Sequence, residues 1–185
     1  MKIKKKLTIA DFMEMEAMEK QYYNSDYIAD YKNAFDWYEK FSFTSMAIFD
    51  EGKIIGFLDL FPVKEPIVDL LKKGMYNDKN LKTEDIVDIR KIKEGQFNLF
   101  LCCIVIDKAY RKSDASKLLL KTYMNFYQSF LTQGISFDEV ITDNVTVEGE
   151  RFSEKLGFKK LLKSDHGSVI YCHKFNDLCE VVKNL

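Results

Sequence analysis

Residues 104–119 read IVIDKAYRKSDASKLL, and this stretch decides the fold. The apolar run from Phe97 to Ile106 is typical of a strand covered on both faces. It leads through a polar turn and small residues into an amphipathic helix. The first N–H groups of a helix have no partner within the helix and carry partial positive charge, so a pyrophosphate can bind there. Arg111, Lys112 and Lys117 add positive charge around the same point.

The chain before this stretch predicts two helices and a hairpin. The expected elements are a short strand over Lys2–Leu7, a helix capped by Thr8 and running to Tyr22, a helix over Asp30–Phe41, and strands over Thr44–Phe49 and Lys53–Phe61. Pro62 and Pro66 are expected to end this hairpin. The polar segment at about 63–96 is expected to be a helical insertion, with helices over Ile67–Lys73 and Thr83–Ile89.

The chain after this stretch alternates again. The expected elements are a helix over Ala115–Phe130 closed by Gly134, a strand over Asp138–Thr142, a helix over Thr146–Leu156, and strands over Phe158–Lys163 and Val169–Phe175. These patterns predict one α/β (α+β) domain over residues 1–185, built on a mixed sheet flanked by helices. Val169–Phe175 could form an edge strand that pairs with a second copy, which makes a homodimer possible.

Aromatic residues concentrate in the two N-terminal helices and the segment between them: Tyr22, Tyr23, Tyr27, Tyr31, Phe35, Trp37 and Tyr38. One interpretation is that these rings are the buried faces of two short helices. The other is that some of them form the wall of a binding pocket, because aromatic rings offer rigid contact area in such clefts.

Composition excludes several classes of function. The formal net charge is -1, so no basic field attracts nucleic acid or an anionic membrane. No window approaches the ~18 apolar residues that a membrane helix needs. The four cysteines show no CxxC spacing, and adjacent Cys102 and Cys103 are expected on opposite faces of a strand. We therefore expect reduced thiols, no metal site and a cytoplasmic protein.

Two motifs resemble the GNAT superfamily of N-acetyltransferases. The first is the stretch quoted above, in which Arg111 fills the first position of the family's phosphate loop and Leu118–Leu120 follow at the right distance. The second is GERFSEKLGF at residues 149–158, which is similar to the family's closing helix. The resemblance implies a GNAT-like fold with a mostly antiparallel sheet.

The resemblance also implies that acetyl-CoA is the co-substrate and that an amine attacks its thioester directly. The acceptor is then a primary amine of a small molecule or a peptide. The pantetheine arm is expected to pair with the backbone of residues 104–106, and the pyrophosphate to lie beside the amides of residues 112–117. The implied cofactor-binding residues are Ile104, Val105, Ile106, Arg111, Lys112, Ser113, Asp114, Ala115, Ser116 and Lys117.

The chain departs from the family pattern at two positions. Asp114 and Ser116 replace loop glycines, and an Asp114 carboxylate that capped the helix would occupy the amides that a pyrophosphate uses. Ser153 stands where the family places its general-acid tyrosine, and it is either a catalyst or a packing residue. Alternative acids are Cys103, Tyr123, Tyr171 and water.

Three residues are candidate bases. Asp143 follows a strand, and is otherwise a turn or helix-capping residue. His166 has an ordinary pKa near ~6.5, which suits proton transfer, but it lies in a plain turn sequence. Glu94 precedes the apolar strand and is otherwise a solvated loop charge. The alternative to an enzyme is a GNAT-fold module that binds acyl-CoA or another ligand without turnover, or an interaction domain that contacts a partner through residues 63–96.

Overall fold

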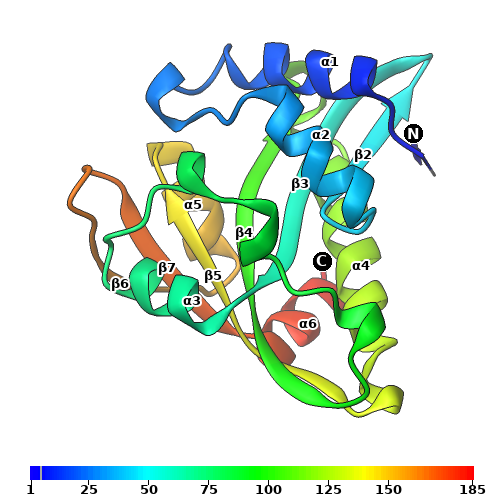
Figure 1. Ribbon diagram of the computed structural model, residues 1–185. Coiled ribbons are helices and arrows are strands. Elements are labelled where there is room, and N and C mark those ends of the chain that lie inside the picture. The colour runs from blue at the N-terminus through cyan, green and yellow to red at the C-terminus, as the bar shows by residue number, and fades with distance from the viewer. Residues whose placement is uncertain (5) are drawn as a thin grey trace.

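One seven-stranded sheet organises the chain in the computed structural model, which describes residues 1–4 and 6–185. Across the sheet the strands are β1 (Lys2–Ile3), β2 (Ser45–Asp50), β3 (Lys53–Val63), β4 (Gly95–Ile106), β5 (Ile135–Asn144), β7 (Val169–Lys174) and β6 (Lys159–Lys163). Only β4 and β5 pair in parallel; every other neighbouring pair is antiparallel. The expected mixed, mostly antiparallel sheet is therefore confirmed (Figure 1).

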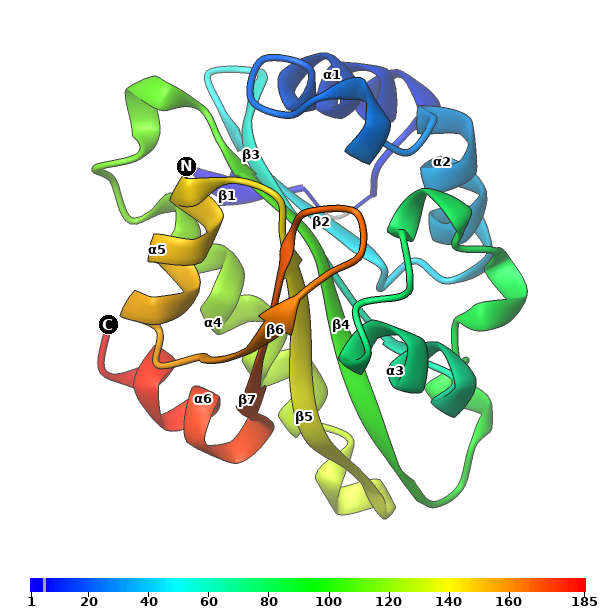
Figure 2. The same ribbon diagram turned by 90° about the vertical axis from the view of Figure 1, so that its left-hand side faces the viewer.

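Helices cover both faces of this sheet. They are α1 (Ile9–Glu19), α2 (Tyr31–Lys40), α3 (Glu65–Lys72), α4 (Ala115–Gln128), α5 (Val147–Lys155) and α6 (Phe175–Lys183). Figure 2 shows α4, α5 and α6 on one side of the sheet and α1, α2 and α3 on the other. In the described part of the chain, none of the helices combines the length and the apolar character needed to cross a bilayer.

Several helices begin where the local signals place them. The Thr8 side chain accepts from Asp11 N while Asp11 returns a hydrogen bond to the Thr8 backbone, so a capping box starts α1. The Thr146 hydroxyl accepts from Gly149 N at the start of α5. Helix α4 ends at Gln128, earlier than predicted, and a 3₁₀ turn then leads to Gly134, whose φ of 81° ends the segment.

The parallel pair β4 and β5 separates before β4 ends. Their register runs from Gly95 opposite Ile135 to Leu101 opposite Thr142, and then stops. Beyond this point β4 continues, and residues 103–106 pair only with β3. At the same place the β3 register shifts, because Asp59 lies opposite Cys103 while Leu60 lies opposite Leu101, which leaves Cys102 as a bulge. The sheet therefore opens at the end of β4 that leads to α4.

The predictions that Pro62 ends the hairpin and that Thr83–Ile89 forms a helix were wrong. Strand β3 continues through Pro62 to Val63, and Pro66 lies in the first turn of α3, where a missing N–H costs nothing. Instead of a helix over Thr83–Ile89, the chain forms short 3₁₀ turns. It is held flat against β3 because Val63 bridges to Ile86, and both Ile86 and Ile89 are buried.

Three further expectations at the chain ends need correction. Strand β1 is shorter than Lys2–Leu7, and Lys5 lies outside the described residues. Strand β7 is not an edge strand, because it lies between β5 and β6, so it cannot pair with a second copy. Helix α6 was not predicted, although Phe175, Leu178 and Val182 are buried at helical spacing. The sequence pattern instead places Phe175, the first residue of this helix, in the preceding strand.

Candidate functional site

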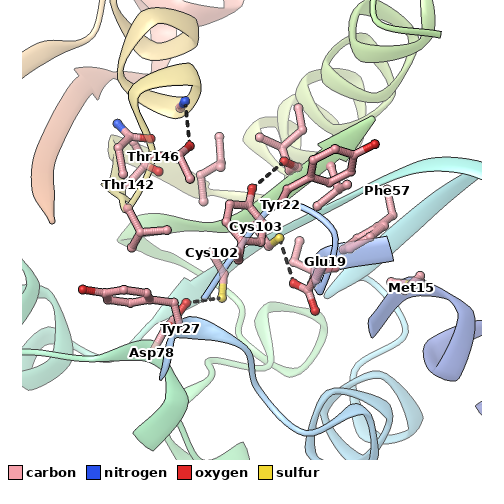
Figure 3. A pocket seen from close by; sticks show the side chains of 18 of the residues that line it. Met15, Glu19, Tyr22, Tyr27, Phe57, Asp78, Cys102, Cys103, Thr142 and Thr146 are labelled. Carbon is pink, nitrogen blue, oxygen red and sulfur yellow. Dashed lines mark hydrogen bonds between the residues drawn. The ribbon is translucent and has the colours of Figure 1, made fainter. Parts of the chain in front are cut away.

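A cavity of about 520 Å³ lies where β4 leaves β5. Its lining includes β4 residues 101–106, the end of β5 and the start of α5. Helices α1 and α2, strand β3 and Asp78 of the insertion complete the wall. Figure 3 shows Glu19 of α1, Phe57 of β3 and Asp78 from close by. The cavity therefore exists because the parallel pair separates and the N-terminal segment covers the opening.

Three carboxylates and two thiols meet inside the cavity. The Cys103 Sγ donates to Glu19 Oε1 at 3.0 Å, and the Cys102 Sγ donates to Asp78 Oδ2 at 3.4 Å. Asp59 lies on β3 directly opposite Cys103 and lines the same space. Both thiols reach the cavity because the bulge at Cys102 breaks the alternation of the strand, so the expectation of opposite faces was wrong.

Burial changes the protonation of these groups. Burial, with smaller contributions from neighbouring carboxylates, raises the pKa of Glu19 to about 8, of Asp59 to about 7 and of Asp78 to about 6. Burial and the same carboxylates raise the pKa of Cys102 and Cys103 well above its ordinary value. The cavity therefore holds carboxyl groups that exchange protons near neutral pH beside thiols that stay protonated.

Tyrosines from the segment between α1 and α2 lie over the free end of β4. The Tyr23 hydroxyl donates to the Ile104 carbonyl oxygen at 3.0 Å, and the Tyr22 hydroxyl accepts from Lys108 N at 3.2 Å. The Arg111 guanidinium lies 4.4 Å from the centre of the Tyr22 ring, and its Nε donates to the Ile106 carbonyl oxygen at 3.3 Å. The segment between α1 and α2 is thus hydrogen-bonded to the part of the chain beyond Leu101 that β5 does not pair with.

Both interpretations of the aromatic cluster hold, each for part of it. Tyr22, Tyr23, Tyr27 and Tyr31 line the cavity. Tyr38 is buried, and its hydroxyl accepts from Leu7 N at 3.0 Å, so it is part of the core. The helical spacing alone could not separate these two roles.

Five of the ten predicted cofactor-binding residues line the cavity: Ile104, Val105, Ile106, Arg111 and Ser116. The other five do not: Lys112, Ser113, Asp114, Ala115 and Lys117. Ala115 is fully buried, and the Lys117 Nζ donates to the Leu185 carbonyl oxygen. Contact between these residues and a bound pyrophosphate stays a prediction.

The Asp114 carboxylate does not cap α4. Asp114 occupies the N-cap position of α4, but its carboxylate makes no capping hydrogen bond. The Ser113 hydroxyl accepts from Ala115 N at 3.2 Å and donates to the Tyr110 carbonyl oxygen at 2.6 Å. The Ser113 hydroxyl occupies the Ala115 amide, and the Asp114 carboxylate occupies none. Asp114 therefore disfavours a bound anion only through its negative charge.

Two of the candidate bases come together although 23 residues separate them in the chain. The His166 Nε2 lies 2.9 Å from Asp143 Oδ2 and 3.0 Å from Ser168 Oγ, while its Nδ1 lies 2.8 Å from Asp165 Oδ1. Burial lowers the pKa of His166, but the two carboxylates outweigh burial and raise it above its ordinary value. Asp143 lines the cavity and His166 lies behind it. The loop over residues 165–168 therefore supports the cavity wall without lining it.

Of the remaining catalytic candidates, Ser153 lines the cavity, whereas Tyr123, Tyr171 and Glu94 do not. Ser153 lines the cavity, and its hydroxyl accepts from Asn144 Nδ2 at 2.8 Å. Tyr123 is buried in the core and donates to the Leu58 and Phe43 carbonyl oxygens, whereas the Tyr171 hydroxyl donates to Glu150 and Glu154 outside the cavity lining. Both tyrosines are excluded as acids at this site. Glu94 is exposed and directly precedes β4, at the end of that strand away from the cavity. It is therefore excluded as a base.

The sequence interpretation missed Glu19, Asp59 and Asp78. Two of them had a signal: Glu19 follows Phe12 and Met15 on the buried face of a helix, and Asp59 interrupts an apolar strand. A lone carboxylate at either kind of position has to be paired or functional. Asp78 lies in a polar turn and had no signal. Over residues 1–4 and 6–185, no group of His, Cys, Asp and Glu side chains is arranged to hold a metal ion.

No protein-family model and no curated protein matches the sequence. Solved structures do match. The GNAT-like decarboxylase GphF in complex with isobutyryl-CoA superposes with a TM-score of 0.67 at 15% identity, covering 95% of this chain and 100% of that one. The loading GNATL domain of CurA from Lyngbya majuscula gives 0.62 at 13% identity, with 95% and 98% covered. The chain has the GNAT fold.

A third GNAT structure extends the comparison to an acetyltransferase. The polyamine N acetyltransferase of Drosophila melanogaster superposes with a TM-score of 0.56 at 10% identity, covering 94% of this chain and 100% of that one. The predicted GNAT-like fold is therefore confirmed over nearly the whole chain. At these identities the likeness describes the backbone, and the chemistry has to be argued from the residues of this cavity.

Proposed function

We propose that the chain is an acyltransferase that moves an acetyl group from acetyl-CoA to a primary amine of a small molecule or peptide by direct transfer. The observation that carries this proposal is the release of β4 from β5 after Leu101. Residues 102–106 then offer backbone groups to a pantetheine arm along the wall of the cavity. The turn that carries Arg111 then leads to the start of α4, where the Ser113 hydroxyl takes the Ala115 amide and the amides that follow would receive a pyrophosphate.

Asp143 is the proposed general base. Its Oδ2 is held by His166, whereas its Oδ1 is buried without a hydrogen-bond partner among the described residues. In the proposed reaction the amine nitrogen attacks the thioester carbonyl carbon, and Asp143 takes a proton from that nitrogen. His166 is a positioning residue, because it orients the carboxylate without lining the cavity.

Ser153 is the proposed partner of the leaving group. When the carbon–sulfur bond breaks, the CoA thiolate has to take up a proton. The Ser153 hydroxyl lines the cavity and has a donor free, because in its bond to Asn144 the hydroxyl oxygen is the acceptor. A serine hydroxyl is a weak acid, so we propose that it donates a hydrogen bond to the thiolate and that solvent supplies the proton.

The charge of the cavity favours amine acylation over decarboxylation. Six acidic side chains line it (Glu16, Glu19, Asp59, Asp78, Asp143 and Glu148), and Arg111 is the one basic side chain among the described residues that do. Where these side chains are ionised, the lining would repel an acyl group that carries a free carboxylate and would attract a cationic amine. Amine acylation is therefore the function that the residues support best.

The test is release of free CoA thiol from acetyl-CoA in the presence of a panel of primary amines, with propionyl-CoA and isobutyryl-CoA as parallel donors. We expect thiol release that depends on the amine, and a loss of about 10²–10⁴ in kcat for Asp143→Asn. Asp177→Asn is the matched control, because Asp177 is exposed on α6. Binding of acetyl-CoA with no thiol release would instead identify a binding module. Absence of acetyl-CoA binding in a thermal-shift titration would refute both readings.

A further inference from the structure

The carboxylates of the cavity come from three separate parts of the fold. Asp59 lies within β3. Glu19 is the last residue of α1, and Asp78 begins the 3₁₀ turn that follows α3 (Figure 3). Folding thus gathers three groups that repel one another when ionised and that lose hydration when buried. Such a cluster is unfavourable in the empty protein, and a bound cationic ligand would offset that cost.

Asp59 lines the cavity and has a carboxylate oxygen without a hydrogen-bond partner in the described part of the chain. Its side chain is 7% exposed, and its Oδ1 makes no hydrogen bond to any of the described residues. Buried polar atoms in folded proteins nearly always have a partner. The position therefore calls for a donor from a bound molecule.

The partners already present do not neutralise the cluster. Each of Glu19 and Asp78 accepts from one thiol, and a thiol is a weak donor without charge. Arg111, the one basic side chain that lines the described cavity, is held against Tyr22 and Ile106 at the turn before α4. In the empty protein, bound protons neutralise part of the cluster near neutral pH. A bound organic cation would take the place of these protons.

The wall beside the carboxylates is aromatic. Tyr22, Tyr23, Tyr27 and Trp37 line the same cavity, and aromatic faces attract organic ammonium groups by cation–π interaction. A cavity of about 520 Å³ also accommodates a small organic cation together with an acyl group. Carboxylates and aromatic faces together favour an alkylammonium over an inorganic ion.

We propose that Asp59, with Glu19 and Asp78, binds the second ammonium of an aliphatic diamine acceptor, while the first amino group gives up a proton to Asp143 and is acylated there. This inference rests on the proposed acyl transfer and adds the chemical class of the acceptor. It also gives the insertion over residues 63–96 a role, because that insertion supplies Asp78. The charge of Asp143 contributes to the raised pKa of Asp78, which indicates that the two ends of the site are close enough to interact.

The kinetic test compares acceptors that differ only in the second charge. With acetyl-CoA as donor, we expect kcat/KM for 1,4-diaminobutane to exceed that for 1-aminobutane at least about 10-fold, which corresponds to about 1.4 kcal/mol. In Asp59→Asn we expect the preference for the diamine to be lost through a higher KM for 1,4-diaminobutane. Asp78→Asn is the second variant, and Asp177→Asn on the exposed face of α6 is the control. Equal kcat/KM for the two amines, or an unchanged preference in both variants, would overturn the proposal.

A binding test separates this inference from the proposed function. Thermal shift at pH 8 without any acyl donor measures the subsite alone. We expect stabilisation by 1,4-diaminobutane that 1-aminobutane and MgCl₂ do not reproduce at equal ionic strength, and that Asp59→Asn abolishes. If the diamine stabilises the protein but no amine is acylated, the proposed acyl transfer is refuted while the proposed ammonium subsite is supported. Equal stabilisation by Mg²⁺, or none by the diamine, would refute the subsite.

Discussion

The Tyr23 hydroxyl donates a 3.0 Å hydrogen bond to the carbonyl oxygen of Ile104, 81 residues away in the chain. The segment that carries Tyr23 thereby uses a backbone acceptor on the part of β4 that β5 has left free. A pantetheine arm that pairs with β4 at this position would have to replace the Tyr23 hydroxyl. Acyl-CoA binding and the position of the tyrosine segment are therefore expected to be coupled.

Removing this hydroxyl should favour acyl-CoA. We expect Tyr23→Phe to lower the Kd of acetyl-CoA about 2- to 10-fold, because a hydrogen bond of this kind contributes about 0.5–1.5 kcal/mol that the ligand no longer has to displace. Isothermal titration gives the Kd. Tyr27→Phe is the matched control, since the Tyr27 hydroxyl donates to the His166 carbonyl oxygen instead. A weaker or unchanged affinity in Tyr23→Phe would show that the pantetheine arm does not use Ile104.

Two basic residues near the start of α4 should differ in their effect on CoA. Arg111→Ala is expected to raise the Kd of CoA about 10-fold or more, because a charge-assisted hydrogen bond to phosphate contributes about 1.5–3 kcal/mol. Lys117→Ala is expected to change it less than about 2-fold, since the Lys117 Nζ already binds the Leu185 carbonyl oxygen. Isothermal titration of CoA against the two variants measures this difference. The reverse ranking would contradict the placement of the pyrophosphate.

The Asp114 carboxylate should weaken CoA binding through its charge alone. We expect Asp114→Asn to tighten CoA binding about 2- to 5-fold, the size of a single charge effect at a helix N-terminus. The gain should shrink when the salt concentration is raised, because this exposed charge is screened. An affinity gain that does not depend on salt would point to a change in backbone conformation instead.

His166 should act on the rate through Asp143. We expect His166→Gln to lower kcat about 10-fold with little change in KM. The ratio of wild-type to variant kcat should be larger below the pKa of His166, which the two carboxylates raise, than above it. A pH series of initial rates measures both effects. A ratio that stays constant with pH would show that His166 has only a structural role.

The free protein should lose stability as the pH rises from 5 to 8. Glu19, Asp59 and Asp78 keep their protons in the folded state at pH values where an unfolded chain has lost them, so the folded state binds more protons in this window. By linkage the free energy of unfolding then falls with pH, and the raised pKa of His166 acts in the same direction.

Asp59→Asn isolates one of these contributions. Its asparagine imitates the protonated carboxyl, so we expect the fall in Tm between pH 5 and pH 8 to be smaller than in the wild type. Asp177→Asn, which changes an exposed carboxylate on α6, should show the full fall. Thermal melts over the pH series decide the matter, and parallel curves for wild type and Asp59→Asn would contradict the burial of an ionisable Asp59.

Much of the architecture was predictable because its signals are local. Thr8, Thr146 and Gly134 mark segment boundaries through hydrogen bonds or dihedral angles confined to a few residues. Helix α6 carried the same kind of signal in Phe175, Leu178 and Val182, and was missed because Phe175 was assigned to the strand before it. The turns over residues 83–91 were missed because contact with β3, rather than local preference, decides their conformation.

The sequence by itself determined that an apolar strand passes through a basic turn into the helix at Ala115, because strand and helix periodicities and turn chemistry act over short distances. Only the tertiary structure decided what that strand faces. The bulge at Cys102 turns both thiols into one cavity, and three carboxylates from α1, β3 and the insertion meet there. Contacts between residues so far apart in the chain depend on the packing of the whole fold, which no local pattern specifies.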